Sequence, residues 1–240
     1  MYISQSSGIP ENQLLAALPA SEYQRLLPHL ELVSLPLRKV LYEADEPIEY
    51  VYFLNRAIAS LVSTMEDGST VEIGLVGNEG MVGLPVILGG NMTNSQAFVQ
   101  VADGGMRMKA SLLKTEFNRG GALQTLLLLY TQALYTQVSQ SAACNRLHTL
   151  EERLARWLLC VQDRVQSNEF PLTQEFISQM LGTRRAGVTE AAGILSQAGV
   201  IRYTRGRITI LNRENLKATS CECYKLIKSE CDRLLCTGRH

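Results

Sequence analysis

The residues whose side chains most clearly indicate a chemical role are arginines in the last third of the chain. Residues 171–217 carry seven basic side chains and three acidic ones. Guanidinium groups donate paired hydrogen bonds to phosphates and to the major-groove edge of guanine. This stretch therefore favours binding to a polyanion. Its arginines include an adjacent pair and a group of three: Arg184, Arg185, Arg202, Arg205 and Arg207.

Two short helices must position the adjacent pair. Thr173 stands at the start of an apolar-periodic run and is a suitable N-cap, and Gly182 ends that helix. Thr183 can cap a second helix, which runs to about Ala198 and is ended by Gly199. Two helices joined by a glycine-containing turn are typical of a helix-turn-helix.

The group of three falls in a predicted β-hairpin. Residues 200–203 and 207–211 alternate around a turn at 204–206, so the whole unit is a predicted winged helix. Its second helix would enter the DNA major groove, with Arg185 on a guanine and the wing arginines on phosphates. The alternative is a winged helix that contacts another protein while its arginines stay solvated. The candidate DNA-binding residues are Thr173, Thr183, Arg184, Arg185, Gly187, Thr189, Glu190, Arg202, Arg205 and Arg207.

Cysteines are the second chemical feature, and four of the six lie near the end of the chain. Cys221, Cys223, Cys231 and Cys236 are separated by one, seven and four residues, which does not match the paired Cys-x2-Cys of zinc knuckles. Reduced thiols on a packed helix are the favoured interpretation, and a metal or redox role is left open. The sequence therefore predicts no metal ligands and no cofactor.

Cys144 and His148 form a third feature. They lie four residues apart, so a helix places them on one face, as a nucleophile beside a base would require. No Gly-rich oxyanion turn and no orienting carboxylate complete such a site. The chain also has no Walker loop, no GxGxxG and no HExxH. We expect no enzyme activity.

Short strands are predicted before these residues. Between residues 32 and 109, apolar runs alternate with Gly, Asp and Asn turns, and Asp67-Gly68 marks a tight hairpin. This spacing predicts a β-sandwich or small barrel over residues 1–120, in a chain of the α+β class. Residues 1–110 carry 6 basic and 12 acidic side chains, so an acidic domain precedes a basic one.

A long helix is predicted over residues 121–166, where neither Pro nor a further Gly occurs after Gly121. One seam along it repeats about every 3.5 residues, which favours pairing with a second copy of the helix. The alternative is packing against the chain's own β-domain. Residues 167–240 would then hold the winged helix and a C-terminal helix. The seam contains Leu123, Leu127, Tyr130, Leu134, Val138, Ser141, Asn145 and His148.

Composition excludes several other classes. Hydrophobic residues make up 46% of the 240 residues and charged residues 19%, so a sizeable core can be buried. No apolar run approaches the ~20 residues that a membrane helix needs. The N-terminus has neither the basic start nor the apolar stretch of a signal peptide. We expect a soluble cytoplasmic protein with no membrane partner.

The order of β-sandwich, long helix and winged helix resembles the Crp/Fnr family of bacterial transcription regulators. The most specific segment is LTQEFISQMLGTRRAGVTEAAGILSQAGVI at 172–201, and VGNEGMVGLPVILGG (76–90), ACNRLHTLEERLARWLL (143–159) and SCECY (220–224) resemble one branch of that family. The resemblance implies a DNA-binding transcription regulator that acts as a homodimer on a near-palindromic double-stranded site. It also implies a sensor domain that sets DNA affinity, and it leaves RNA polymerase open as a further partner.

The resemblance places an effector pocket in the β-domain. Members that bind cyclic AMP carry Gly-Glu-Leu-Gly-Leu and then Arg-Ser-Ala, which align here with residues 80–84 and 95–97. Met81 replaces the Glu and Ser95 replaces the Arg, so tight binding of cyclic AMP is not expected, because its phosphate loses a charge-assisted partner. The effector is unknown, and a filled pocket without any effector is the alternative. The expected lining is Met81, Gly83, Leu84, Ser95, Gln96, Leu127 and Tyr130.

Two further departures concern DNA reading and iron–sulfur chemistry. The family's base-contacting pattern of Arg-Glu, with Arg four residues after the Glu, reads here as Arg185-Ala186 followed by Glu190. The chain is therefore expected to recognise a different DNA sequence. Iron–sulfur members carry a cysteine cluster before the β-domain, whereas no cysteine precedes Cys144 here, so no such cluster is expected.

Overall fold

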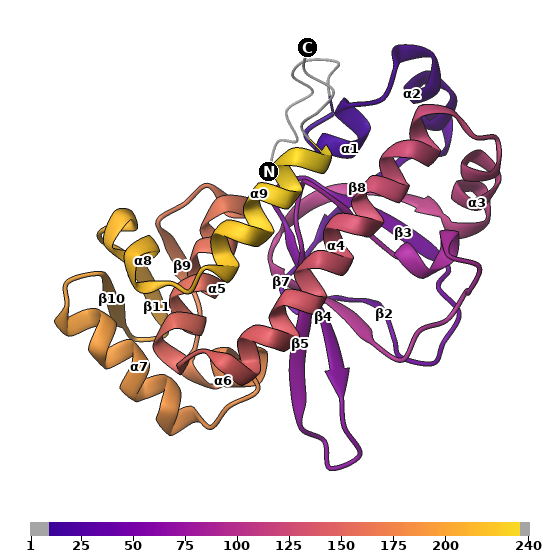
Figure 1. Ribbon diagram of the computed structural model, residues 1–240. Helices are drawn as coiled ribbons and strands as arrows, with labels where there is room; N and C mark the ends of the chain where they lie inside the picture. Colours follow the sequence, from indigo (N-terminus) through magenta and orange to yellow (C-terminus); the bar gives the residue numbers. More distant parts are fainter. Residues whose placement is uncertain (1–9, 236–240) are drawn as a thin grey trace.

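Strands dominate the first half of the structure, a computed structural model that describes residues 10–235. Eight strands form two antiparallel four-stranded sheets, of order β1-β8-β3-β6 and β2-β7-β4-β5 (Figure 1). The strands are β1 (Glu31–Leu35), β2 (Val40–Tyr42), β3 (Tyr50–Leu54), β4 (Ile58–Thr64), β5 (Thr70–Val76), β6 (Met81–Val82), β7 (Gln96–Val101) and β8 (Asp103–Lys109). The short helices among them are α1 (Gln13–Ala16), α2 (Ala20–Leu26), η1 (Leu27–His29) and η2 (Leu84–Ile87).

The two sheets enclose one apolar core. Val51 and Phe53 of β3 are fully buried in it together with Ala97 and Val99 of β7. The predicted β-sandwich and the α+β class are therefore confirmed. The predicted hairpin turn joins β4 to β5, where Gly68 takes a φ of 79° that glycine adopts readily.

Helices dominate the rest of the described chain. They are α3 (Ala110–Asn118), α4 (Gly121–Leu147), α5 (Leu150–Val165), α6 (Gln174–Met180), α7 (Arg185–Gln197), α8 (Arg213–Thr219) and α9 (Cys223–Leu235). A small antiparallel sheet of order β10-β11-β9 joins β9 (Glu169–Pro171), β10 (Ile201–Thr204) and β11 (Arg207–Ile210). A second core built around Trp157, Phe170, Ile177, Val188 and Ile208 unites α5 with the winged helix.

The helix predicted over residues 121–166 is in fact two helices, α4 and α5. His148 caps the end of α4 in an extended conformation, and Thr149 begins α5 through a capping box with Glu152. The Glu152 carboxylate accepts from the Thr149 amide at 2.8 Å, and Thr149 Oγ1 accepts from the Glu152 amide at 3.4 Å. These bonds satisfy the free amides of a new helix start, which explains the break. We call residues 148–149 the domain joint.

The predicted self-pairing seam of α4 faces mostly into its own chain. Leu123, Leu127, Tyr130 and Leu134 are buried in the sandwich core, and Val138 packs against that core. The alternative of packing on the chain's own β-domain is therefore correct for these residues, because the sandwich offers the helix an apolar face. In the rest of the seam, Ser141 and His148 are half-buried and Asn145 is exposed.

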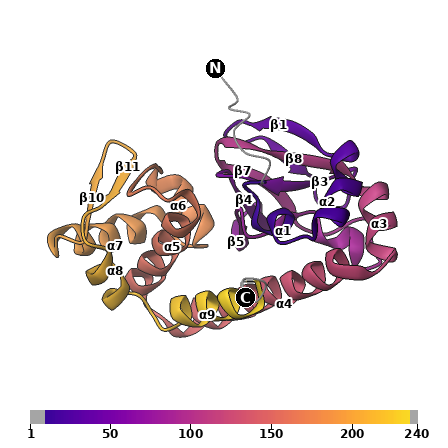
Figure 2. The same ribbon diagram turned by 90° about the horizontal axis from the view of Figure 1, so that it is seen from above.

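Helix α9 returns along α4 (Figure 2). It thus connects the end of the winged helix to the helix that carries the sandwich. Among the described residues, no helix combines the length and the hydropathy that crossing a bilayer requires.

Candidate DNA-binding interface

The helix-turn-helix is built by α6 and α7. Thr173 caps α6 as predicted, since its Oγ1 accepts from the Phe176 amide at 3.1 Å. Gly182 has a φ of 57° in the turn between the helices. Arg184, and not Thr183 as predicted, is the N-cap of α7, and no side chain caps that helix start. The amides of the first turn of α7 are therefore not used by a capping side chain.

The first turn of α7 presents polar side chains to solvent. Arg184, Arg185, Thr189 and Glu190 are all exposed. Thr189 Oγ1 lies 3.0 Å from Gln174 Oε1, so it links α7 to α6 instead of projecting freely. Together with the wing arginines these residues form what we call the reading surface.

Gly187 has a structural reason for being glycine. A Cβ at this position would lie 2.9 Å from the Leu150 side chain of α5. Helix α7 therefore approaches α5 more closely than a larger residue permits. The sequence suggested Gly187 as a DNA contact, and the structure gives it a packing role beside the domain joint.

The wing is the tight hairpin between β10 and β11. Arg205 and Gly206 form its two-residue loop, with φ values of 50° and 75°, as type I′ turns require. Arg202 and Arg205 are exposed. Arg207 pairs with Glu169 at 2.6 Å, so its charge is already compensated.

The ion pairs divide the basic residues of this region into two groups. Arg213 forms an ion pair with Asp163 at 2.5 Å and donates a hydrogen bond to the Tyr224 hydroxyl at 2.8 Å, so it links α8 to α5 and α9. Lys217 pairs with Glu214 on α8 at 2.9 Å. Among the residues that the structure describes, no carboxylate pairs with the remaining four arginines, so these cations stay available to an external anion. They are Arg184, Arg185, Arg202 and Arg205.

A crevice separates the start of α7 from the sandwich. It has a volume of about 810 Å³, and its walls include Thr183, Arg184 and Arg185 on one side and the β4–β5 hairpin, from Met65 to Val71, on the other. Gly182 and Val71 approach closely across it, because a Cβ on Gly182 would lie 3.0 Å from Val71 Cγ2. The DNA-reading turn thus sits beside a loop of the first domain.

A buried carboxylate strengthens the contact between the two domains. The indole Nε1 of Trp157 in α5 donates to Glu72 Oε1 in β5 at 2.8 Å. The other oxygen of Glu72 is shielded from solvent and has no hydrogen-bond partner among the described residues. Burial raises the pKa of Glu72 to about 7, against the opposing influence of its hydrogen bonds and of Arg156 and Arg164.

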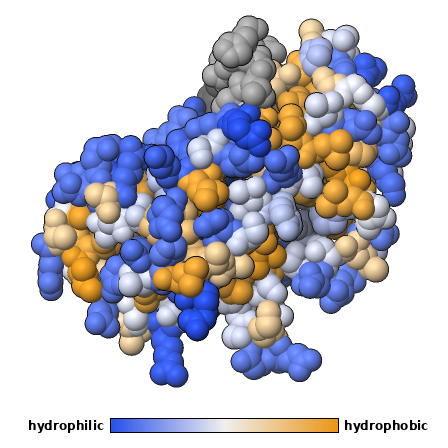
Figure 3. Space-filling view, viewed as in Figure 1, coloured by the Kyte–Doolittle hydropathy of each residue, from blue (hydrophilic) through white to orange (hydrophobic). Residues whose placement is uncertain are grey.

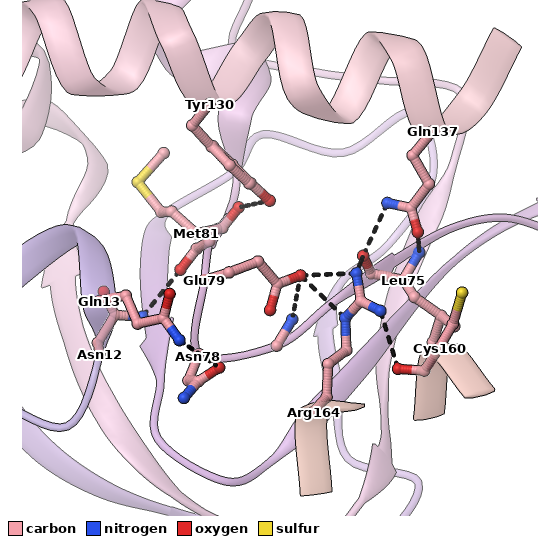
Figure 4. Close-up of polar contacts among 12 residues, drawn as sticks. Asn12, Gln13, Leu75, Asn78, Glu79, Met81, Tyr130, Gln137, Cys160 and Arg164 are labelled. Carbon is pink, nitrogen blue, oxygen red and sulfur yellow. Dashed lines mark hydrogen bonds and ion pairs between the residues drawn. The ribbon is translucent and has the colours of Figure 1, made fainter. Parts of the chain in front are cut away.

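A second polar contact joins α5 to the β5–β6 turn (Figure 4). Arg164 pairs with Glu79 at 2.7 Å, and both side chains are largely buried. Arg164 also donates to the Cys160 carbonyl at 2.9 Å. Gln137 of α4 bonds both backbone groups of Leu75, at 3.3 Å and 3.0 Å. Sandwich, α4 and α5 therefore meet in one network.

The residues expected around an effector do not share one environment. Met81, Leu84, Leu127 and Tyr130 are buried, and the Tyr130 hydroxyl donates to the Met81 carbonyl at 3.1 Å. The Tyr130 ring also occupies the space above Gly80, where a Cβ would lie 2.4 Å from it. Gly83 is buried beside them with a φ of 104°. Ser95 and Gln96 bond elsewhere, to Thr93 at 3.1 Å and to Glu43 at 2.5 Å.

Three cysteines and one histidine form a cluster, although in the sequence they belong to two separate features. Cys144, His148, Cys221 and Cys223 have their ligating atoms within 4.8 Å of one another. Cys231 lies on α9 outside this group, and Cys236 lies outside the described residues. The available signals were two short spacings, Cys144-x3-His148 and Cys221-x-Cys223. Nothing local indicates that these two pairs meet.

Residues 152–219 match the family model of the Crp-like helix-turn-helix domain. The matched stretch includes most of α5, both helices of the helix-turn-helix, the wing and α8. The chain has the fold of a Crp/Fnr-type transcription regulator. A comparison with curated protein sequences found no match.

Solved structures support the Crp/Fnr fold over most of the chain. A Crp/Fnr family protein from Eubacterium rectale superposes with a TM-score of 0.69 at 15% identity, covering 86% of this chain and 96% of that one. FixK2 from Bradyrhizobium japonicum gives 0.66 at 19% identity, covering 80% and 98%. The c-di-GMP-responsive regulator CLP from Xanthomonas campestris gives 0.64 at 12% identity, covering 80% and 99%. The N-terminal sandwich, which the family resemblance predicts to be a sensor domain, fits the cyclic-nucleotide-binding-like fold of these neighbours.

Proposed function

We propose that this protein is a sequence-specific DNA-binding transcription regulator that binds a near-palindromic double-stranded site as a homodimer. The observation that carries this proposal is the reading surface. Four of its arginines, which have no ion-pair partner within residues 10–235, lie at the start of α7 and on the wing, while nearby basic residues are already paired. We propose no enzyme activity for the protein, because the side chains of the reading surface are suited to recognising DNA and not to breaking bonds.

The reading surface suggests a role for each exposed side chain. Arg185 would donate to guanine O6 and N7 in the major groove. Glu190, one turn further along α7, can accept a hydrogen bond from a cytosine amino group. Arg202 and Arg205 on the wing suit phosphates, which position the domain without reading sequence. Arg207 contributes less, because binding a phosphate would compete with Glu169.

The homodimer is proposed to form through the face of α4 that the sandwich leaves uncovered. Leu128 and Tyr135 are 50% and 73% exposed there, and Ala142 is exposed too. These three residues are spaced seven apart, as in helices that pair with a copy of themselves. In the view of Figure 3, apolar side chains gather over the N-terminal half of α4. A two-fold axis along α4 would present two reading surfaces to half-sites about one DNA turn apart.

Control by the first domain is proposed to act through the contacts that join the domains. The β4–β5 hairpin borders the start of α7, and Glu72 holds Trp157 of α5. A change in the sandwich would therefore alter the orientation of α7. We assign no effector, since Tyr130 occupies the space above Gly80. RNA polymerase is a proposed further partner, and the cytoplasm is the proposed location.

Selection of bound sequences from a random duplex pool, at two salt concentrations, tests the proposal. We expect an enriched two-fold-symmetric motif, and an affinity that falls steeply as salt rises, because bound phosphates release counterions. The Arg202→Ala, Arg205→Ala double variant should bind more weakly and with a smaller salt slope. Weak, salt-insensitive binding without an enriched motif would instead favour a winged helix that contacts protein. The selection should then be repeated with cell extract, in case an effector is needed.

A further inference from the structure

The cysteine cluster joins two segments that lie far apart in the sequence. Cys144 is on the last turn of α4 and His148 caps that helix, whereas Cys221 and Cys223 flank the start of α9. The Sγ atoms of Cys144 and Cys221 are 3.5 Å apart, and Cys223 Sγ lies 3.5 Å from His148 Nδ1. All three cysteines are buried, and together they form a small core of their own.

These two separations match those of a tetrahedral set of metal ligands, and all four ligating atoms lie within 4.8 Å of one another. Zn–S bonds of ~2.3 Å and Zn–N bonds of ~2.0 Å in a tetrahedron place two sulfurs about 3.8 Å apart, and a sulfur about 3.5 Å from a nitrogen. A disulfide needs its sulfurs at about 2.05 Å, far closer than Cys144 and Cys221 lie. The ligands of an iron–sulfur cluster bind different iron atoms and must spread wider than those of a single ion. The geometry therefore suits one ion.

Neighbouring side chains orient the ligands as in known metal sites. His148 Nε2 lies 3.2 Å from a carboxylate oxygen of Glu222, which leaves Nδ1 facing the three sulfurs. A carboxylate behind a histidine is a common means of fixing the ring and raising its basicity as a ligand. Gln140 Nε2 donates to Cys223 Sγ at 3.1 Å. Such hydrogen bonds stabilise a thiolate.

A buried cation beside the cluster balances the charge that a metal site would carry. Arg156 is only 7% exposed, and its Nε atom has no hydrogen-bond partner among the described residues. Its positive charge acts electrostatically on the nearby thiols of Cys160, Cys144 and Cys221. Three thiolates and one divalent ion carry a net charge of minus one, which Arg156 neutralises. Buried charges in proteins are paired in this way or bind metal.

We propose that Cys144, His148, Cys221 and Cys223 bind one zinc-type divalent ion, which ties the start of α9 to the domain joint. Both ligand pairs lie just outside the matched helix-turn-helix domain, at residues 152–219, so that domain alone does not contain the site. The ion would hold α9 against the end of α4 and restrict movement of the winged helix about residues 148–149. This proposal concerns metal binding and does not rest on DNA recognition.

Metal analysis of the full-length protein, purified under reducing conditions, is the first test. We expect about one equivalent of zinc per chain. After removal of zinc by a chelator, titration with Co²⁺ should produce the visible bands and the thiolate charge-transfer bands of tetrahedral cobalt, saturating at one ion per chain. A chain without bound metal that also gives no such cobalt spectrum overturns the proposal.

Variants separate these ligands from other cysteines. Cys144→Ser and Cys223→Ser should each lose zinc and the cobalt spectrum, whereas Cys231→Ser, a half-buried control on the same helix as Cys223, should keep both. Glu222→Gln should weaken metal affinity by about 10–100-fold while retaining the spectrum, because it supports a ligand without being one. Glu222 is 75% exposed, so this variant should fold normally. Full metal content in both ligand variants would contradict the assignment.

Two other results would replace the zinc site with different chemistry. Iron and acid-labile sulfide in the purified protein would indicate a cluster. A mass deficit of two hydrogens, together with two fewer titratable thiols, would indicate a disulfide. If zinc is found, its removal should speed proteolytic cleavage at the domain joint, and this readout is independent of DNA binding.

Discussion

The reading surface and the contact between the two domains, which we call the domain interface, are built in opposite ways. The reading surface consists of exposed side chains from one continuous segment, residues 184–207. The domain interface is assembled from largely buried side chains of β5, the β5–β6 turn, α4 and α5. A surface that binds DNA must leave its cations uncompensated, whereas an interface between domains must pair or neutralise the charges that it buries. Substitutions should therefore affect recognition at the first region and stability at the second.

The largest effect is expected at the Arg164–Glu79 pair of the domain interface. Arg164→Ala leaves the largely buried Glu79 carboxylate without its cation, which typically lowers the free energy of unfolding by about 3–5 kcal/mol. Urea unfolding at neutral pH measures the loss. Arg207→Ala, which removes the exposed pair with Glu169 at the reading surface, should cost less than about 1 kcal/mol. Equal losses from the two substitutions would remove the distinction between the regions.

The Glu72–Trp157 contact makes the domain interface sensitive to pH. The pKa of Glu72 is about 7 in the folded protein, whereas the ordinary pKa of this side chain is 4.5, so between these pH values the folded state holds a proton that the unfolded state releases. The stabilisation from this group is thus complete below pH 4.5 and is lost as pH rises to about 7, by at most about 1.4 kcal/mol per pH unit. Glu72→Gln should remove this dependence of the free energy of unfolding on pH, which we call the pH slope.

Urea unfolding followed by the fluorescence of Trp157, the one tryptophan of the chain, measures the free energy of unfolding of both proteins at a series of pH values. Glu66→Gln, on the exposed β4–β5 turn, is the matched control and should leave the slope unchanged. A slope that persists in Glu72→Gln would mean that another group takes up the proton.

At the reading surface the expected effect is on specificity. Arg185→Ala should cost about 1–3 kcal/mol of DNA-binding free energy and relax preference at one base pair, while stability changes little. Arg205→Ala should weaken all sequences alike and lower the salt slope by about one. Competition binding against a panel of single-base variants distinguishes the two. If Arg185→Ala also weakens all sequences equally, then Arg185 contacts phosphate and not a base.

The same contrast explains what could be predicted from the sequence. The helix-turn-helix, its Thr173 cap and the wing turn depend on residues within a few positions of one another, so local spacing is enough. The seam of α4 shows that an apolar stripe identifies a buried face without identifying its partner: Leu127 and Tyr130 face the chain's own sandwich. The cluster of Cys144 with Cys221 joins residues 77 positions apart, which only the tertiary fold brings together.

The smallest expected effect tests the boundary between the two regions. Thr149 and Glu152 form a capping box that separates α5 from α4, a signal already present in the sequence as Thr-x-x-Glu but overlooked beside the long seam. Thr149→Ala should lower the free energy of unfolding by about 1 kcal/mol, because an amide at the start of α5 loses its acceptor. Thr173→Ala removes the corresponding cap of α6 and should cost a similar amount. If the cap also maintains the joint, Thr149→Ala alone should speed proteolysis at residues 148–149, and equal cleavage of both variants would show that the cap stabilises α5 without controlling the joint.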